Sequence, residues 1–215
     1  MLTRLMLLYI LVALVGCAAF NREPPPQLTA DGLQLISNPD FDELYIHPQS
    51  DFSQYDSVHV ADAQIEFEKG WQADQNLSDP FRITDRDIKR IKRLLGKEVR
   101  RIFKHDLAAG TNYEIVDKPG PHTLIVTPTI VDLYINAPFN SRGYRITVLA
   151  EQAGRMTLKL ELADAATNQV LLRLADRRRT LNFGHLQIQG PVRNLQESRR
   201  LLHRWSESLI LVLSS

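Results

Sequence analysis

The sequence predicts an α+β fold, a single two-layer domain with an antiparallel-rich mixed sheet and two helices on one face. Apolar residues recur at helical spacing over residues 84–107 and again after Pro191. Residues 155–163 alternate strictly between apolar and polar, and residues 169–180 return with the same alternation. The order of strand, helix, several strands and helix is typical of an α+β domain.

The N-terminal part of the domain is rich in turn signals. Asp31-Gly32, Asn38-Pro39 and His47-Pro48 predict an irregular arm over residues 31–54 that lies on the domain surface. Residues 57–67 predict a strand whose apolar residues change parity, which requires a bulge or break near Ala61. Residues 70–81 are expected to form a polar loop.

Residues 84–107 give the clearest helix. Thr84 followed three residues later by Asp87 resembles a capping box, and Gly110 supplies a stop. One stripe is expected to face the core, formed by Ile88, Ile91, Leu95, Val99, Ile102 and Phe103.

The central part of the chain predicts further strands. Residues 113–116 form a short strand and residues 122–135 a long one, in which Pro128 implies an edge position or a bulge and a bend. Residues 137–143 are expected to be a loop, 144–150 a strand and 151–154 a turn.

The C-terminal part predicts a hairpin and a helix. Met156, Leu158, Leu160 and Leu162 should point inward, with Thr157, Lys159 and Glu161 outward. After a loop over residues 183–190, Pro191 opens the last helix, whose buried stripe is expected to be Leu195, Leu202, Trp205, Leu209 and Leu213.

The first residues form a secretion signal. Arg4 precedes an apolar run from Leu5 to Val15, which is too short to cross about 30 Å of hydrocarbon. The run ends at Leu14-Val15-Gly16-Cys17, which resembles the lipobox of bacterial lipoproteins. The resemblance implies cleavage between Gly16 and Cys17 and covalent acylation of Cys17. The alternative is an ordinary cleaved signal with a chance cysteine.

The resulting organisation is a lipoprotein signal peptide over residues 1–16, a lipidated tether over 17–30 and a periplasmic α+β domain over 31–215. Pro24, Pro25 and Pro26 favour an extended spacer. The lipobox resemblance also implies that Ala18, in place of an aspartate, directs the protein to the outer membrane, facing the periplasm.

Composition narrows the possible functions. Without Arg4 the chain balances 25 basic against 25 acidic residues, so bulk charge predicts no nucleic-acid partner. Cys17 is the only cysteine, which excludes a disulfide, a cysteine metal site and a cysteine nucleophile in the mature domain.

The helix over residues 84–107 is strongly basic. We expect a partner-binding patch for an anionic surface at Lys89, Arg93, Lys97, Arg100 and Arg101. The alternative is the solvated face of an amphipathic helix. A second cluster, Arg177 to Arg179, either extends the patch or protects a sheet edge by charge.

Motifs for catalysis, metals and cofactors are absent from the sequence. The six histidines include no pair at i and i+4, and neither a Gly-x-Ser-x-Gly elbow nor a phosphate-binding loop occurs. We therefore expect no catalytic residues, no metal and no cofactor beyond the covalent lipid on Cys17. Trp71, with Phe67 and Phe81, forms either an exposed aromatic loop for a partner or a hydrophobic plug.

Several segments together resemble an uncharacterised bacterial lipoprotein family, domain of unknown function 3313. The segments are Tyr45-Ile46-His47-Pro48, residues 51–58, residues 116–124 and residues 154–179. The resemblance extends from about Asp31 to the final helix. The family has no established activity, so it implies no catalytic residue.

The sequence thus predicts a membrane-anchored lipoprotein with a non-catalytic periplasmic domain that binds an envelope protein or glycan. One alternative is a periplasmic hydrolase acting on cell wall or glycolipid. Another is contact with lipid or lipopolysaccharide through the basic helix.

Overall fold

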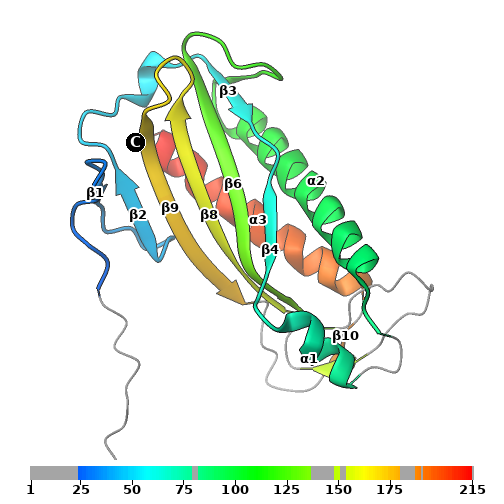
Figure 1. Cartoon of the computed structure of the whole chain (residues 1–215). Helices are drawn as coiled ribbons and strands as arrows, with labels where there is room; N and C mark the ends of the chain where they lie inside the picture. Colours follow the sequence, from blue (N-terminus) through cyan, green and yellow to red (C-terminus); the bar gives the residue numbers. More distant parts are fainter. Residues whose placement is uncertain are drawn as a thin grey trace, which may run out of the picture.

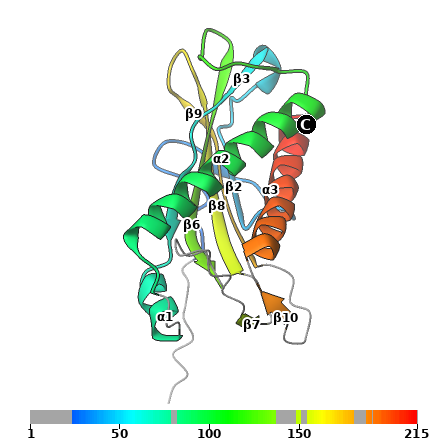
Figure 2. The same ribbon diagram turned by 90° about the vertical axis from the view of Figure 1, so that its right-hand side faces the viewer.

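A computed structural model describes residues 24–78, 82–136, 148–150, 154–179, 187–189 and 191–214. A mixed sheet of eight strands carries two long helices on one face (Figures 1 and 2). The helices are α2 (Asp85–Gly110) and α3 (Pro191–Leu213), and a shorter helix, α1 (Trp71–Ser78), lies at one end of the sheet. This arrangement confirms the predicted α+β class.

The sheet follows the order β1-β2-β9-β8-β6-β3-β5, with β4 also paired to β6. The antiparallel side contains β1 (Gln34–Leu35), β2 (Glu43–Ile46), β9 (Val170–Arg179) and β8 (Gly154–Asp164). The central strand is β6 (Thr123–Ile135), and β3 (Ser57–Val60), β4 (Gln64–Phe67) and β5 (Glu114–Ile115) form the parallel side. A separate pair joins β7 (Val148–Ala150) to β10 (Gln187–Gln189).

The predicted break near Ala61 separates β3 from β4. Val60 pairs with Val126 and Gln64 with Thr129, so the broken strand uses one more residue than β6 over this interval. The extra residue moves the following apolar side chains to the other parity, which brings Ile65 into the core.

Pro128 lies opposite this break. Of the two predicted alternatives, an edge position or a bulge, the edge position is wrong, because β6 is paired on both sides and Pro128 itself is aligned with Leu160 of β8. The Val126 carbonyl accepts a hydrogen bond from Ala61 N at 2.9 Å. Backbone groups two residues apart in a strand point to the same side, so those of Pro128 also face the side of β3 and β4. The missing N–H therefore points at the interruption between β3 and β4, where no ladder bond is required.

The long helix α2 begins and packs as its sequence predicts. Thr84 N donates to Asp87 Oδ2 at 2.9 Å and Thr84 Oγ1 accepts from Asp87 N, which completes the capping box. Most of the predicted stripe is buried, while Ile88 and Ile91 are half-buried. The helix continues through Gly110, and Thr111 caps its end.

Helix α3 is fixed to the sheet through Trp205. This side chain is buried, and its Nε1 donates to Asp176 Oδ2 of β9 at 2.7 Å. Asp176 is itself only 2% exposed and also accepts from Arg178 Nε at 2.5 Å. Leu202, Leu209 and Leu213 are buried as predicted. The expectation for Leu195 was wrong, because this side chain is 42% exposed and lines a groove between α2 and α3 rather than facing the sheet.

Two expected loops are regular elements. The polar loop over residues 70–81 contains α1, in which Trp71 is 1% exposed, stacks on Phe67 at 4.1 Å and donates from Nε1 to the Ile135 carbonyl at 3.1 Å. Trp71 and Phe67 thus form a plug, and Phe81 lies outside the described residues. Part of the loop expected over 183–190 forms β10.

The arm over residues 31–54 is not a surface layer but an extension of the sheet. Strand β2 pairs with β9, and β1 pairs with β2. Leu44 and Tyr45 are both buried because they lie within this extension. Before it, Thr29 N donates to the Leu33 carbonyl at 2.9 Å, which ties the end of the predicted tether to the domain.

The hairpin of β8 and β9 has the predicted register. Met156, Leu158, Leu160 and Leu162 are buried, and Lys159 and Glu161 are exposed. Thr157 differs from its expected outward position: it is buried, and its hydroxyl donates to Asp132 Oδ2 at 3.3 Å.

Several predictions fall outside the described residues. They concern the signal, Cys17, the start of the tether, the loop over 137–143, the first part of the strand over 144–150 and most of the turn over 151–154. Among the helices of the described residues, none combines the length and apolar character needed to cross a membrane.

The packing of α3 predicts effects of very different size on stability for two leucines two residues apart. Leu209 is fully buried and Leu211 is 65% exposed. Leu209→Ala should lower the free energy of unfolding by about 2–5 kcal/mol, because it leaves a cavity. Leu211→Ala should change it by less than about 0.5 kcal/mol. Urea unfolding measures both, and equal effects would contradict the helix orientation.

Candidate functional site

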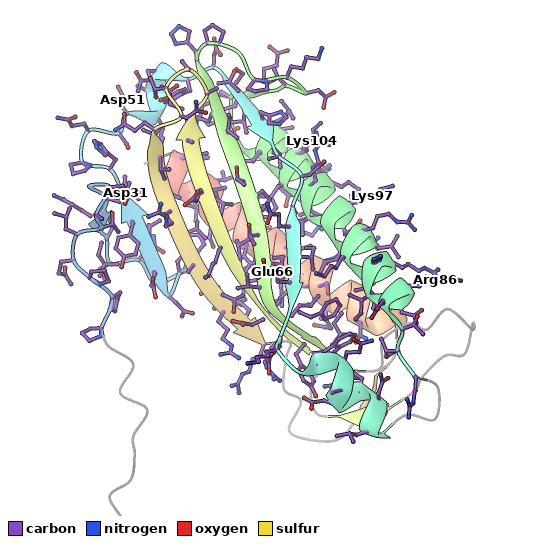
Figure 3. All side chains as sticks on the ribbon, in the orientation of Figure 1. Asp31, Asp51, Glu66, Arg86, Lys97 and Lys104 are labelled. Atoms are coloured by element: carbon purple, nitrogen blue, oxygen red, sulfur yellow. The ribbon has the colours of Figure 1, made fainter. Side chains whose placement is uncertain are left out.

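The exposed face of α2 concentrates positive charge. Between Asp87 and Glu98 the helix carries basic side chains and no acidic one: Lys89, Arg90, Lys92, Arg93 and Lys97. None of them forms an ion pair with another described residue. Figure 3 shows Arg86, Lys97 and Lys104 extending from the outer side of the helix.

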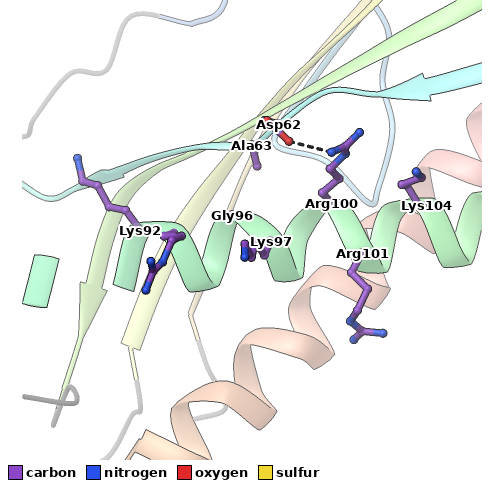
Figure 4. A pocket seen from close by; sticks show the side chains of 9 residues that line it. Asp62, Ala63, Lys92, Gly96, Lys97, Arg100, Arg101 and Lys104 are labelled. Carbon is purple, nitrogen blue, oxygen red and sulfur yellow. Dashed lines mark hydrogen bonds and ion pairs between the residues drawn. The ribbon is translucent and has the colours of Figure 1, made fainter. Parts of the chain in front are cut away.

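A hollow of about 600 Å³ lies beside this face, where α2 passes the break between β3 and β4. We call it the basic hollow; it is lined by Asp62, Ala63, Lys92, Arg93, Gly96, Lys97, Arg100, Arg101 and Lys104 (Figure 4). Six of these residues are basic and one is acidic. The strand break therefore provides a recess beside the most basic stretch of the chain.

Gly96 allows the helix to approach the break closely. A Cβ at this position would lie 3.1 Å from the Ala63 carbonyl oxygen, closer than ordinary van der Waals contact. Glycine inside a helix costs roughly 1 kcal/mol relative to alanine, so the close approach is made at the expense of helix stability. Gly96 and Ala63 leave this part of the hollow without bulky side chains.

Arg100 holds the wall of the hollow. Its Nε donates to the Val60 carbonyl at 3.0 Å and its NH1 to Asp62 Oδ1 at 3.1 Å. The bond from Nε supplies a donor to the Val60 carbonyl at the end of β3. This carbonyl lies beyond Ser57 and Val58, the two residues of β3 that pair with β5. Arg100 therefore contributes to the fold as well as to the charge of the surface.

Lys104 and Arg101 are also paired within the domain. Lys104 Nζ lies 2.8 Å from Asp117 Oδ1, and this contact lowers the pKa of the exposed Asp117. Arg101 forms two hydrogen bonds with Glu98, at 2.9 and 3.1 Å, and Arg199 of α3 binds the same carboxylate. The bonds from Arg101 lower the pKa of Glu98 against the opposing effect of burial, and bonds from Arg199 add to the lowering.

The five candidate residues therefore differ in whether they line the hollow and in whether they have acidic partners. Arg93, Lys97, Arg100 and Arg101 line the hollow, while Lys89 lies one turn before Arg93 and does not line it. Arg100 and Arg101 have acidic partners inside the domain, whereas Lys89, Arg93 and Lys97 have none among the described residues. Figure 4 shows Arg101 pointing away from Asp62, toward the neighbouring helix.

The sequence analysis did not predict the recess. Lys92 and Gly96 line it and are not among the candidate site residues. A glycine inside a long helical pattern was the available signal, because such a glycine is typical of close backbone approach. Two polar residues beside the break, His59 and Asp62, contact other parts of the domain: the His59 ring lies 3.1 Å from the Val116 carbonyl, and Asp62 binds Arg100.

A second hollow of about 330 Å³ separates α2 from α3. It is mostly apolar and includes Leu94 and Leu195, which are both exposed, together with Ile91 and Leu95. Arg90 lies at its margin. Helix α2 thus has an apolar flank facing α3 and a basic flank facing the strand break.

A serine, a histidine and an aspartate meet between α2 and α3. His203 Nδ1 lies 2.7 Å from Asp106 Oδ2, and Ser206 Oγ donates to the same oxygen. In a hydrolytic triad the serine must bind the histidine ring, but Ser206 instead contacts Asp106 and the His203 carbonyl. Ser206 is also 0% exposed, so the cluster joins two helices rather than presenting a nucleophile.

The electrostatics of this cluster support a structural role. Burial raises the pKa of Asp106, but hydrogen bonds from Ser206, His105 and His203 outweigh it, and the net pKa is lowered. Within the described part of the chain, no group of three or more histidine, cysteine, aspartate or glutamate residues is placed to hold a metal ion.

Comparison with known families then identifies the chain. Residues 27–209 match the family described as protein of unknown function (DUF3313). The chain belongs to the DUF3313 family. This confirms the resemblance found in the sequence, and the match covers the hollow, all of α2 and α3 as far as Leu209. No curated protein matches the chain.

Solved structures include distant likenesses to this DUF3313 domain. A variant PelC dodecamer from Paraburkholderia phytofirmans is 12% identical, with a TM-score of 0.39 over 82% of this chain and 97% of that chain. A PelC dodecamer from the same organism in another crystal form is 11% identical, with a TM-score of 0.36 over 81% and 96%. A candidate lipoprotein from Caulobacter crescentus CB15 is 12% identical, with a TM-score of 0.33 over 75% and 90%. Likenesses this distant carry no inference about assembly or function.

Arg100 and Lys97 should differ in their effect on stability. Arg100→Ala removes the donor to the Val60 carbonyl and should lower the free energy of unfolding by about 1 kcal/mol. Lys97→Ala removes an exposed cation that forms no ion pair with another described residue, and it should change the free energy of unfolding by less than about 0.5 kcal/mol. Urea unfolding compares the two, and a larger loss in Lys97→Ala would contradict the assigned role of Arg100.

Asp106→Asn should destabilise the domain in a pH-dependent way. The lowered pKa means that ionised Asp106 stabilises the fold above the unfolded value near 3.8, and that this contribution disappears as the pH falls through the folded value. At pH 7 we expect a loss of about 1–3 kcal/mol. The difference from wild type should shrink at about pH 3, measured by urea unfolding, with Asp74→Asn on an exposed residue as control. A loss of the same size at both pH values would contradict this assignment.

Proposed function

We propose that this DUF3313 protein is a lipid-anchored protein of the bacterial envelope that binds an anionic partner through α2 and catalyses no reaction. Its task would be to recruit or stabilise that partner close to the membrane. The proposal has two parts, the anchor and the binding surface, which rest on different residues and are tested separately.

The binding surface rests on one observation, the row of unpaired cations on α2. Elsewhere in the described residues many cations are paired, as Arg155 is with Glu68 and Arg173 with Asp31 and Glu161. Lys89, Arg93 and Lys97 are exposed and have no such partner among the described residues. Because the net charge of the chain is only +1, this row is a local concentration of charge rather than a general property of the surface.

The anchor rests on the sequence around Cys17. Each buried acyl CH₂ contributes about 0.8 kcal/mol, and stable anchoring takes two lipid signals, which a triacylated cysteine exceeds. Three prolines at residues 24–26 provide a spacer with a rise of about 3.1 Å per residue. Anchoring would raise the effective concentration of the domain for partners at the same membrane. Ala18 supports the outer membrane as the destination.

Neither alternative function has an equally specific support. The Ser206, His203 and Asp106 cluster lacks the contacts that a hydrolase requires. Contact with lipid or lipopolysaccharide would use the same cations on α2, so it specifies the nature of the anionic partner rather than a different surface.

Cys17→Ser tests the anchor. The variant should lose its acyl groups and leave the membrane fraction, because serine supplies no thiol for the lipid. Intact mass and membrane fractionation measure both properties. Ala18→Asp is the companion variant, which should retain the lipid and move the protein to the inner membrane. Unchanged membrane partitioning of Cys17→Ser would contradict the anchor.

Charge reversal tests the binding surface. The triple variant Lys89→Glu, Arg93→Glu and Lys97→Glu should lose the envelope partner recovered by crosslinking in the native host and identified by mass spectrometry. The matched control, Lys69→Glu, Lys118→Glu and Lys159→Glu, changes the net charge equally at exposed residues outside α2. The control should retain the partner.

Recovery of the same partner by both triple variants would contradict the proposed role of α2 in binding it. Loss of the partner from both would show a dependence on net charge rather than on this surface. Thermal melting of each variant verifies that it remains folded.

A further inference from the structure

We propose that the basic hollow is a binding site for phosphate groups. This inference rests on the proposed function, because it assigns a ligand chemistry to the same face of α2. It concerns the recess beside the strand break and three cations that line it without an acidic partner among the described residues, which are Lys92, Arg93 and Lys97.

The charge of the hollow is not neutralised from within. Arg100 is offset by Asp62, Arg101 by Glu98 and Lys104 by Asp117. Lys92, Arg93 and Lys97 have no acidic partner among the described residues, so three positive charges remain around one recess. Like charges around one recess repel one another, and an anion that binds between them relieves the repulsion.

Phosphate fits this arrangement better than a carboxylate. A phosphomonoester carries about −1.5 to −2 charges at pH 7 and three acceptor oxygens, so one group can contact more than one cation. Arginine binds phosphate oxygens in a bidentate manner and lysine binds them as a point charge. A single carboxylate would offset only one of the three charges.

The recess is formed before any ligand arrives. Arg100 is fixed by Val60 and Asp62, and the close contact of Gly96 with Ala63 leaves this part free of bulky side chains. A site whose walls are already ordered loses less conformational entropy on binding. The volume of about 600 Å³ is also within the range of small-ligand sites.

The spacing along the helix favours more than one phosphate. Arg93 and Lys97 line the hollow at i and i+4, so they lie on the same side of the helix with a rise of about 6 Å between them. A diphosphate, or two phosphates on one molecule, could therefore contact these two cations at successive turns. Such groups occur on lipid headgroups and on soluble molecules, and the structure assigns their shared chemistry.

Titration calorimetry on the full mature chain in neutral detergent tests the site. The probes are inorganic pyrophosphate, micelles that carry phosphatidic acid, and citrate as a carboxylate of comparable charge. The variant is Lys92→Gln, Arg93→Gln and Lys97→Gln. The matched control is Lys69→Gln, Lys118→Gln and Lys159→Gln, which removes the same charge at exposed residues outside the hollow.

We expect phosphate probes to bind wild type and the control alike, and to bind the hollow variant roughly ten- to a hundredfold more weakly. Binding of both phosphate probes would show that the group itself is recognised. Binding of phosphatidic acid alone would identify a lipid headgroup as the source, and binding of pyrophosphate alone a soluble ligand. Each of these outcomes supports the site.

Three outcomes would overturn it: no binding of either phosphate probe, equal weakening in the control, or citrate binding as tightly as pyrophosphate. The calorimetry tests the phosphate site and the crosslinking tests the envelope partner, so one proposal can be contradicted without the other. Phosphate binding without a recovered envelope partner would support the phosphate site and contradict the proposed partner. Recovery of a partner without phosphate binding would support the partner and contradict the phosphate site.

Discussion

Burial of the apolar stripes of α2 and α3 against one face of the sheet is the constraint on which the rest of the structure depends. Fully burying a leucine, isoleucine or phenylalanine contributes about 1.5–3 kcal/mol, and many such side chains lie between these helices and the sheet. Once Val99 and Phe103 face inward, helical geometry requires Arg93 and Lys97 to face outward. The exposed charge of α2 is thus a consequence of its packing. The bond from Trp205 to Asp176 adds a directional contact that burial alone does not supply.

The interruption between β3 and β4 connects features that lie far apart in the sequence. Pro128 removes one ladder donor from β6, and the opposite strand breaks where that donor would be needed. The broken strand leaves the Val60 carbonyl for Arg100, and Gly96 brings α2 against Ala63 at the same place. The basic hollow is the space beside this junction. The shape of the hollow therefore results from the interrupted strand pairing, and contacts from α2 stabilise this interruption.

The charged residues of the domain serve two different purposes. Asp106, Asp176 and Glu98 are largely buried and bind several donors each, so they hold helices to one another and to the sheet. The cations in the first half of α2 have no corresponding acids among the described residues. Membership of the DUF3313 family supplies no activity, so this difference between paired and unpaired charge is the main physical indication of function. It is the observation on which the proposed binding of an anionic partner rests.

The sequence by itself determined the class of fold, α2 with its capping box, the β8–β9 hairpin and the break near Ala61, because each depends on local periodicity or capping. It also identified the family and the basic residues of α2. Only the tertiary structure decided that the N-terminal arm joins the sheet, that Leu195 is exposed, and that Arg100 has an acidic partner while Lys92, Arg93 and Lys97 have none among the described residues. These outcomes depend on partners more than 30 residues away, or on the rotation of one helix against another, and a periodic pattern contains neither.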